Sequence, residues 1–469
     1  MKALLKTLQA AALLLSLTSL TSLNAMAAPA QYPAELVERG RYLATASDCM
    51  ACHTAHKGQP MAGGVVMSSP VGNIISTNIT PSKEHGIGNY TLQQFSDALR
   101  KGIRADGAPL YPAMPYTAYA IMTDDDVQAL YAYFMQGVTP VEKGTPATSL
   151  PFPMNVRTSM KAWNALFLDD QPLKPEPQRS SQWLRGRYLA EGAAHCSSCH
   201  TPRGALMQEK RDLYLGGAQV GAWYAPNITS HPTAGIGSWT EAELVQYLRT
   251  GRVPGKAQAA GSMAEAISMS FSKLHDDDLK AIAAYIKDVP AIATDGGQPA
   301  EVSRFAQGKP GNELVALRGK GYQAGMQGQQ VGAQLYSANC ASCHGFDAQG
   351  TKDGYYPSLF HNSASVNTSN LLATILLGVD RHTAEGHVFM PPFGKQANAL
   401  NSLNDEEVAA LANYIQVSYG TGAANVKPAD VAVIRQGGPQ SHLPLLAQLG
   451  MGLAVVLLIG LAVFLRRRR

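Results

Sequence analysis

Three five-residue segments of this chain share one pattern of reactive side chains. Each has two cysteines three residues apart, and a histidine directly follows the second cysteine. Residues three apart lie one above the other on a helical turn, so both thiols can form thioether bonds to the two vinyl groups of one porphyrin. The following histidine is then placed to bind the iron. The pattern predicts covalent haem at three sites: Cys49, Cys52 and His53; Cys196, Cys199 and His200; and Cys340, Cys343 and His344.

A structural zinc site is the main alternative for paired cysteines. Such a site needs four protein ligands, commonly from two separate pairs. The chain has six cysteines, and all of them belong to the three segments, so none remains for a second pair. The lack of spare thiols also argues against a disulfide framework. The sequence therefore favours haem.

The second iron ligand decides between an electron carrier and an enzyme. A methionine opposite the histidine closes the iron and suits electron transfer, whereas an open face allows chemistry. Met114 and Met390 lie in predicted proline-bounded loops just ahead of an acidic helix start. The central segment offers Met263 and Met269. Met263 is favoured because it follows the motif histidine by 63 residues, close to the 61 residues in the first segment.

Two other interpretations of these residues remain open. Any single methionine has core packing as its ordinary role, although the matching position in three segments favours iron ligation. His382 and His387 lie near Met390 and are alternative sixth ligands, which would lower the potential of that haem. A haem with an open site would make the chain an enzyme such as a peroxidase.

Each haem segment is framed by two predicted helices. The leading helix reads Arg-Gly-Arg-Tyr-Leu-Ala at residues 39–44 and again at 185–190. A reduced form occupies residues 332–336, and the shared glycine would let this helix cross closely over another. The closing helix starts with acidic residues, which complement the helix dipole and are expected to act as caps. These acidic runs are residues 124–126, 276–278 and 405–407.

The first two segments share a further insert. Asn-Ile-Thr at residues 78–80 and at 227–229 is followed, eight residues after the asparagine, by Gly-Ile-Gly. An amphipathic helix then ends at Gly102 or at Gly251. The third segment lacks this insert and is the divergent one.

Both ends of the chain carry targeting signals. Lys2 and Lys6 precede an apolar run and a small-x-small cleavage pattern at residues 25–27, which predicts a signal peptide and export. A retained N-terminal anchor is the alternative. Residues 443–465 carry no charge and would span about 34 Å as a helix, enough for a hydrocarbon core of about 30 Å. The four arginines at 466–469 should stay on the cytoplasmic side.

The net charge excludes one class of partner. The leader lysines and terminal arginines supply six of the 38 basic residues, which leaves 32 against 34 acidic residues in the body. A body of this charge has no basic surface of the size that nucleic acid requires, so no nucleic-acid partner is expected.

The chain is expected to be mostly α-helical, with proline-rich or glycine-rich linkers between its parts. The first linker contains Phe152, Trp163, Leu166 and Phe167, which are expected to pack across a junction. The predicted divisions are a signal peptide at 1–27, haem domains at 28–138, 181–289 and 331–420, linkers at 139–180, 290–330 and 421–442, an anchor at 443–465 and an arginine tail at 466–469.

The three haem motifs, the paired Arg-Gly-Arg-Tyr-Leu-Ala and Asn-Ile-Thr segments and the C-terminal anchor together resemble the tri-haem cytochrome c subunit of bacterial membrane-bound dehydrogenases. These are the gluconate, sorbitol, fructose and quinoprotein alcohol dehydrogenases. The resemblance implies three tandem class I-like cytochrome c domains and one C-terminal transmembrane helix. It also implies three covalently bound haem c groups, with Met114, Met263 and Met390 as distal ligands.

In that family a separate flavin or quinoprotein subunit oxidises a sugar, sugar acid or alcohol, and a small third subunit can be present. The resemblance implies that this chain has no catalytic residues of its own, passes electrons to ubiquinone, and sits on the periplasmic face of the inner membrane. Gluconate is the single substrate we expect for the partner. A c-type subunit feeding a terminal oxidase is the further alternative.

Overall fold

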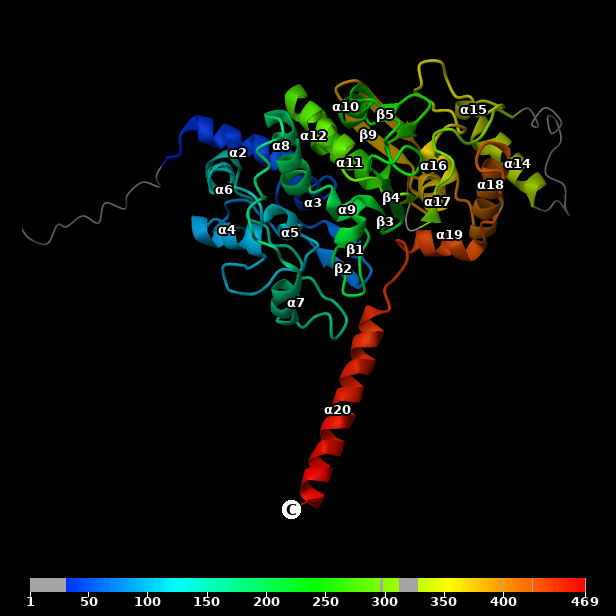
Figure 1. Ribbon diagram of the computed structural model, residues 1–469. Helices are drawn as coiled ribbons and strands as arrows, with labels where there is room; N and C mark the ends of the chain where they lie inside the picture. The colour runs from blue at the N-terminus through cyan, green and yellow to red at the C-terminus, as the bar shows by residue number, and fades with distance from the viewer. Residues whose placement is uncertain (1–30, 296–297, 312–327, 397, 424, 469) are drawn as a thin grey trace, which may run out of the picture.

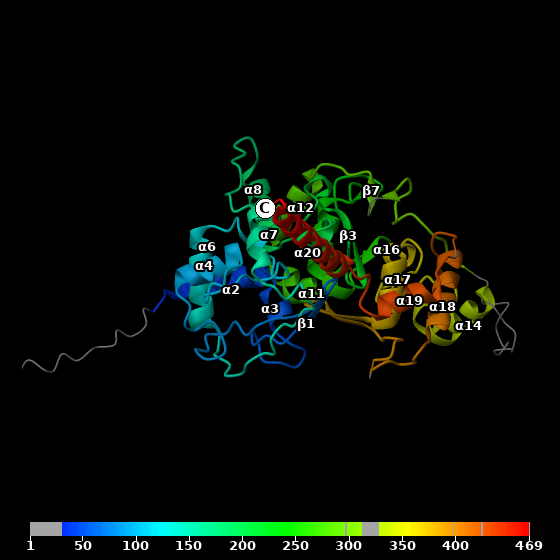
Figure 2. The same cartoon turned by 90° about the horizontal axis from the view of Figure 1, so that it is seen from below.

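The computed structural model describes residues 31–468 except 296–297, 312–327, 397 and 424. The predicted leader at residues 1–27 lies outside the described residues. Three groups of helices lie in a row, and one long helix projects from them (Figure 1). The view from below shows the second group between the first and the third (Figure 2).

The first group begins with α2 and closes with α6. Between them, α4 starts at a capping box formed by Thr91 and Gln94 and ends at Gly102, whose φ of +63° suits glycine. The helix end predicted at Gly102 is confirmed. The elements are α2 (Ala34–Ala46), α3 (Cys49–His53), β1 (Val66–Ser69), β2 (Gly72–Ile75), α4 (Leu92–Lys101), α5 (Tyr116–Tyr119), α6 (Asp124–Ala132) and η1 (Tyr133–Gly137).

The second group repeats this order. Its amphipathic helix α10 starts at a capping box of Thr240 and Glu243 and ends at Gly251, which has a φ of +77°. The elements are α8 (Ser181–Tyr188), η2 (Leu189–Ala193), α9 (Ser197–His200), η3 (Arg211–Leu213), β3 (Gly216–Val220), β4 (Trp223–Asn227), α10 (Glu241–Thr250), β5 (Arg252–Val253), β6 (Ala257–Gln258), α11 (Gly261–Met269), η4 (Phe271–Lys273) and α12 (Asp276–Asp288). A short hairpin of β7 (Thr294–Asp295) and β8 (Gln298–Pro299) follows.

The third group replaces the shared insert with a different middle section. Its closing helix starts at a capping box of Asn404 and Glu407. The elements are α14 (Gln329–Asn339), α15 (Ala341–His344), α16 (Ser363–Val366), α17 (Thr368–Leu377), β9 (Val379–Thr383), β10 (Gly386–Met390), α18 (Asp405–Ser418) and α19 (Pro428–Arg435). The divergence predicted for this part of the chain is visible in its elements.

The leading and closing helices of each group cross at a glycine. A Cβ built on Gly40 would lie 1.9 Å from a backbone oxygen of α6, and one on Gly186 would lie 1.9 Å from a backbone oxygen of α12. The same distance at Gly332, toward α18, is 2.3 Å. Only a residue without a side chain permits these approaches, so the predicted close crossing is confirmed in all three groups.

The first and second groups exchange two tyrosines. Tyr42 of α2 donates to Oδ2 of Asp278 in α12, and Tyr188 of α8 donates to Oδ2 of Asp126 in α6, both at 2.6 Å. Each hydroxyl also accepts the N–H of the residue that precedes the acidic helix, at 3.2 Å in both cases. Each tyrosine thus caps a helix of the other group, which gives the pair an approximate twofold relation.

The same two aspartates also bind arginines of their own groups. Arg39 pairs with Asp126, and Arg185 makes two hydrogen bonds to Asp278 at 2.8 and 2.7 Å. Burial alone raises the pKa of Asp278, but the bonds from Arg185 and Tyr42 outweigh burial and lower that pKa. The acidic runs were expected to act as caps. In the first two runs, the third residue, Asp126 or Asp278, is also buried and bonded to a tyrosine of the other group.

Helix α7 (Ser159–Phe167) lies in the first linker. The indole of Trp163 donates to the backbone oxygen of Leu206 at 2.8 Å, so the predicted packing across a junction is confirmed for this residue. The prediction was wrong for Leu166, which is 71% exposed, and for Phe152, which is also exposed. Helix α7 itself lies on the side of the molecule from which the last helix projects (Figure 1).

The last helix, α20 (Leu443–Arg467), is long and apolar enough to cross a membrane, and no described residue of its most apolar stretch is buried. Its base is held by two hydrogen bonds. The N–H of Ser441 donates to the oxygen of Pro70 at 3.0 Å, and Gln448 donates to the oxygen of Phe152 at 2.6 Å. The anchor therefore leaves the body at the first group, although it follows the third in sequence.

We expect Gly186→Ala to destabilise the protein, because the added methyl group would force α8 away from α12. Overpacking of this kind costs about 1–3 kcal/mol. Thermal unfolding of the purified protein measures the effect, with Gln182→Ala on the exposed face of the same helix as control. Equal unfolding temperatures for the two variants would contradict the close crossing.

Candidate haem-binding sites

Each motif histidine is the last residue of a short helix, which contains both cysteines in the first group and follows the first cysteine directly in the other two. In all three, Nδ1 lies within hydrogen-bond distance of a backbone carbonyl oxygen, and a carbonyl can only accept. The proton therefore sits on Nδ1, and the lone pair of Nε2 is left for a metal. The pairs are His53 with Thr77 at 2.7 Å, His200 with Pro226 at 2.7 Å, and His344 with Pro357 at 2.8 Å.

Burial lowers the pKa of all three motif histidines, and the hydrogen bond to the carbonyl offsets this only in part. The rings are thus held neutral, which is the state that binds a metal.

The Asn-Ile-Thr segments position these histidines. The acceptor carbonyls of the first two groups belong to the residues directly before Asn78 and Asn227. Each asparagine donates to two carbonyl oxygens of the following linker, at 2.8 and 3.0 Å for Asn78 and 2.8 and 2.7 Å for Asn227. Its Oδ1 accepts from both the N–H and the O–H of Thr80 or Thr229. The repeat was visible in the sequence. Its role in holding the carbonyl that orients the motif histidine became apparent only in the structure.

The predicted distal methionines of the first two groups lie at the same interval along the chain from the end of the amphipathic helix. In both, the glycine that ends the amphipathic helix accepts from an N–H eight residues later, in Leu110 or Ala259, at 2.7 Å. The methionine follows four residues after that, at Met114 and Met263. Met269 is 37% exposed and lines a small cavity at the first group, so it points away from this position.

The third group departs from the expected loop. Met390 is the last residue of β10 and pairs with Val379 of β9, so the loop prediction was wrong for this residue. Its side chain nevertheless packs against the core of the third group. His382 and His387 both direct Nε2 to Oδ1 of Asp380, at 3.0 and 2.8 Å, on the exposed face of the hairpin.

Comparisons with known proteins agree with this geometry. The family model for cytochrome c matches residues 37–137, 184–290 and 329–418. The fructose dehydrogenase cytochrome subunit of Gluconobacter japonicus is 47% identical over 453 residues, which cover 96% of this chain and 92% of the relative. The gluconate 2-dehydrogenase cytochrome c subunit of Pantoea cypripedii is 38% identical, covering 86% and 90%. The quinone alcohol dehydrogenase cytochrome c subunit of Gluconobacter oxydans is 39% identical, covering 86% and 83%.

This chain belongs to the family of cytochrome c subunits of dehydrogenases. The family predicted from the motifs is confirmed.

The second group of this cytochrome subunit has buried donors that fit the carboxylates of a haem. Trp239 Nε1, Arg304 Nε and Arg381 Nε have no hydrogen-bond partner within the described part of the chain. Trp239 packs edge to face against Tyr247, with ring centres 5.6 Å apart. Both arginines act electrostatically on Tyr247, and Arg304 also acts on the motif histidine, His200.

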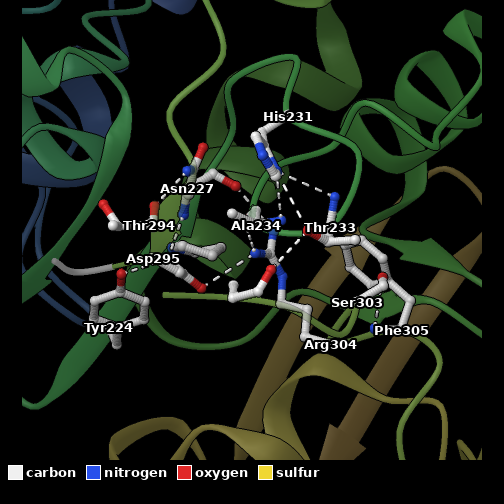
Figure 3. A network of polar contacts seen from close by, with 12 residues as sticks. Tyr224, Asn227, His231, Thr233, Ala234, Thr294, Asp295, Ser303, Arg304 and Phe305 are labelled. Atoms are coloured by element: carbon white, nitrogen blue, oxygen red, sulfur yellow. Dashed lines mark hydrogen bonds and ion pairs between the residues drawn. The ribbon is translucent and has the colours of Figure 1, made fainter. Parts of the chain in front are cut away.

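Arg304 also holds the backbone of this site in place (Figure 3). Its guanidinium donates to the oxygens of Ala234 and Asn227 at 2.8 and 3.0 Å, and to Asp295 at 3.2 Å. Asp295 in turn accepts from the hydroxyl of Tyr224 at 2.5 Å. This network was not predictable from local patterns, because its members come from two separate stretches of chain, residues 224–234 and 295–304.

The first two haem motifs of the cytochrome subunit lie close together. Burial raises the pKa of Cys52, with smaller increases from Asp48 and Cys199, and the half-buried Asp48, directly before the first motif, also acts on Cys199. Burial raises the pKa of Asp48 to about 8, with a further increase from Glu265 of α11. Asp48 has a φ of +51° and an Oδ1 without a partner among the described residues.

We expect the contribution of Asp48 to the free energy of unfolding to fall as the pH rises from about 4 to about 8. The folded protein holds the Asp48 proton more tightly than the unfolded chain, whose carboxyl has a pKa of about 4. Stability is therefore greatest below that value and decreases by at most about 1.4 kcal/mol per pH unit up to the folded pKa.

The variant Asp48→Asn should lose this pH dependence, whereas the exposed control Asp125→Asn should keep it. Thermal unfolding of the holoprotein at pH 5, 7 and 9 measures both. An unchanged slope in Asp48→Asn would show that the carboxyl is ionised in the folded protein.

Proposed function

We propose that this chain is the tri-haem electron-transfer subunit of a membrane-bound dehydrogenase complex. The observation that carries the proposal is the threefold pairing of a neutral histidine, oriented by a carbonyl, with two adjacent cysteines. Haem c bound at each site would supply a one-electron carrier. Cys49, Cys52, Cys196, Cys199, Cys340 and Cys343 would hold three haems covalently.

The axial ligands in this proposal are His53 and Met114, His200 and Met263, and His344 and Met390. The shared register of Met114 and Met263 supports the first two pairs, and the packing of Met390 against its own core supports the third. With both iron faces bound, these residues exclude exogenous ligands and favour electron transfer over catalysis. The class I-like tandem arrangement and its domain limits stay predictions.

The partner in this proposal is a flavin or quinoprotein subunit that oxidises the substrate, and the electron acceptor is ubiquinone. The names of the relatives support a dehydrogenase partner, and a third small subunit stays a prediction. The helix α20 and its terminal arginines support an inner-membrane anchor with the haem groups on the periplasmic side. The relative that is 47% identical is the cytochrome subunit of a fructose dehydrogenase, so we place fructose ahead of gluconate as the substrate to test.

The choice between Met263 and Met269 has a direct spectroscopic test. We expect Met263→Ala to open one iron, so that the reduced protein binds carbon monoxide at one haem of three. Met269→Ala should leave the carbon monoxide spectrum unchanged. Carbon monoxide binding by the second variant alone would transfer the ligand role to Met269.

The function itself is tested on membranes from cells that make the complex. Without oxygen, addition of the correct substrate should reduce the c-type haems, and a soluble ubiquinone analogue should reoxidise them. Fructose, gluconate and ethanol are compared, and a strain lacking this chain is the control. Pyridine haemochrome on the purified subunit should give three haems. Fewer haems, or peroxide turnover by the isolated chain, would contradict the proposal.

A further inference from the structure

Arg381 belongs to the third group but is buried in the second. Its neighbours on β9, Asp380 and His382, are exposed, whereas Arg381 itself is 1% exposed. This alternation is that of a strand with one face against another part of the protein. The guanidinium donates to the oxygen of Ala259 at 2.7 Å and to Oε1 of Gln258 at 3.1 Å. Both acceptors lie in the segment that leads to Met263.

The two buried arginines differ in their acidic partners. Arg304 pairs with Asp295, whereas Arg381 has no carboxylate within 4.0 Å in the described part of the chain. Among the described residues, the one carboxylate that acts electrostatically on Arg381, Glu385, is exposed and pairs with Arg252 at 3.9 Å. An arginine stays protonated in proteins, and an unpaired buried charge strongly destabilises the fold. The residue therefore needs an anion that the protein itself does not supply.

The surroundings of Arg381 identify that anion. Arg381 and Arg304 both act electrostatically on the half-buried Tyr247, and Trp239 lies against this tyrosine with an unpartnered indole N–H. Arg304 also acts on His200, and the backbone oxygen that Arg381 binds belongs to Ala259, four residues before Met263. A haem brings two propionate carboxylates to such a site, and a guanidinium matches a carboxylate with two parallel hydrogen bonds.

We propose that Arg381 binds a propionate of the haem in the second group, so that the third group completes that haem site. The inference rests on the proposed haem function. A buried positive charge beside a haem favours the reduced, less positive state of its iron, so Arg381 raises the potential of that haem. The same contact fixes the segment before Met263 and couples the second group to the third.

A variant pair separates this role from simple packing between groups. Arg381→Gln keeps the size and a donor but loses the charge, and Arg381→Lys keeps the charge. Arg252→Gln is the matched control. Arg252 spans the same interface, to the oxygen of Asp353 at 3.3 Å and to Glu385 at 3.9 Å, but it is not buried.

The measurement is a spectroelectrochemical titration of the three haems in the full purified protein, with the haem content determined in parallel. We expect Arg381→Gln to keep three haems. The equilibrium constant for reduction of one haem should fall at least tenfold, which lowers the reduction potential of that haem by about 59 mV. The shifted haem should be the one that Met263→Ala opens to carbon monoxide. Arg381→Lys should recover most of the shift, and Arg252→Gln should leave all three potentials unchanged.

The outcomes are distinguishable from a failure of the proposed function. Fewer than three haems in the unaltered protein would overturn that function. Three haems with unchanged potentials in Arg381→Gln would overturn the role of Arg381 alone, as would an equal shift in Arg252→Gln. If Arg381→Gln loses one haem, restoration of that haem by Arg381→Lys supports the charge role, and continued loss contradicts it.

Discussion

In each helix pair, a glycine of the leading helix lies directly against a backbone oxygen of the closing helix. At Gly40 and Gly186 a Cβ would lie 1.9 Å from that oxygen. This contact sets where the rest of the group can lie, because the haem motif begins within ten residues of the glycine in the same chain direction. Arg39 and Arg185, each one residue before the glycine, are thereby brought to the acidic start of the closing helix.

The position two residues after the glycine explains why the first two groups pair and the third does not. Tyr42 and Tyr188 occupy it, and each reaches the capped aspartate of the other group. The third group has Gln334 at this position, and its closing helix carries Glu407, which caps its own helix instead. A local cap thus takes the place of an exchanged one. The third group consequently joins the others through a different surface, the hairpin that carries Arg381.

The sequence was sufficient for whatever depends on local spacing. The crossing glycines, which the structure confirms, follow from intervals along the chain, and the cysteine and histidine motifs and the choice of Met263 are predictions from the same intervals. The tyrosine exchange was not predictable, because Tyr42 and Asp278 are 236 residues apart and neither position looks unusual on its own. Arg381 likewise reads as one charged residue in an alternating strand. Which face of that strand is buried depends on the neighbouring group, and no local pattern encodes it.

The segment between the third group and the anchor contacts every group in turn. Helix α19 packs on α18, a Cβ on Gly438 would lie 1.9 Å from the oxygen of Gly221 in the second group, and Ser441 bonds to Pro70 in the first. A free tether would let the body rotate over a membrane. Here backbone contacts to all three groups precede α20, so the orientation of the body relative to this helix is fixed by the fold. These contacts, the exchanged tyrosines and the buried Arg381 all link one group to another, whereas the glycine crossings act within each group.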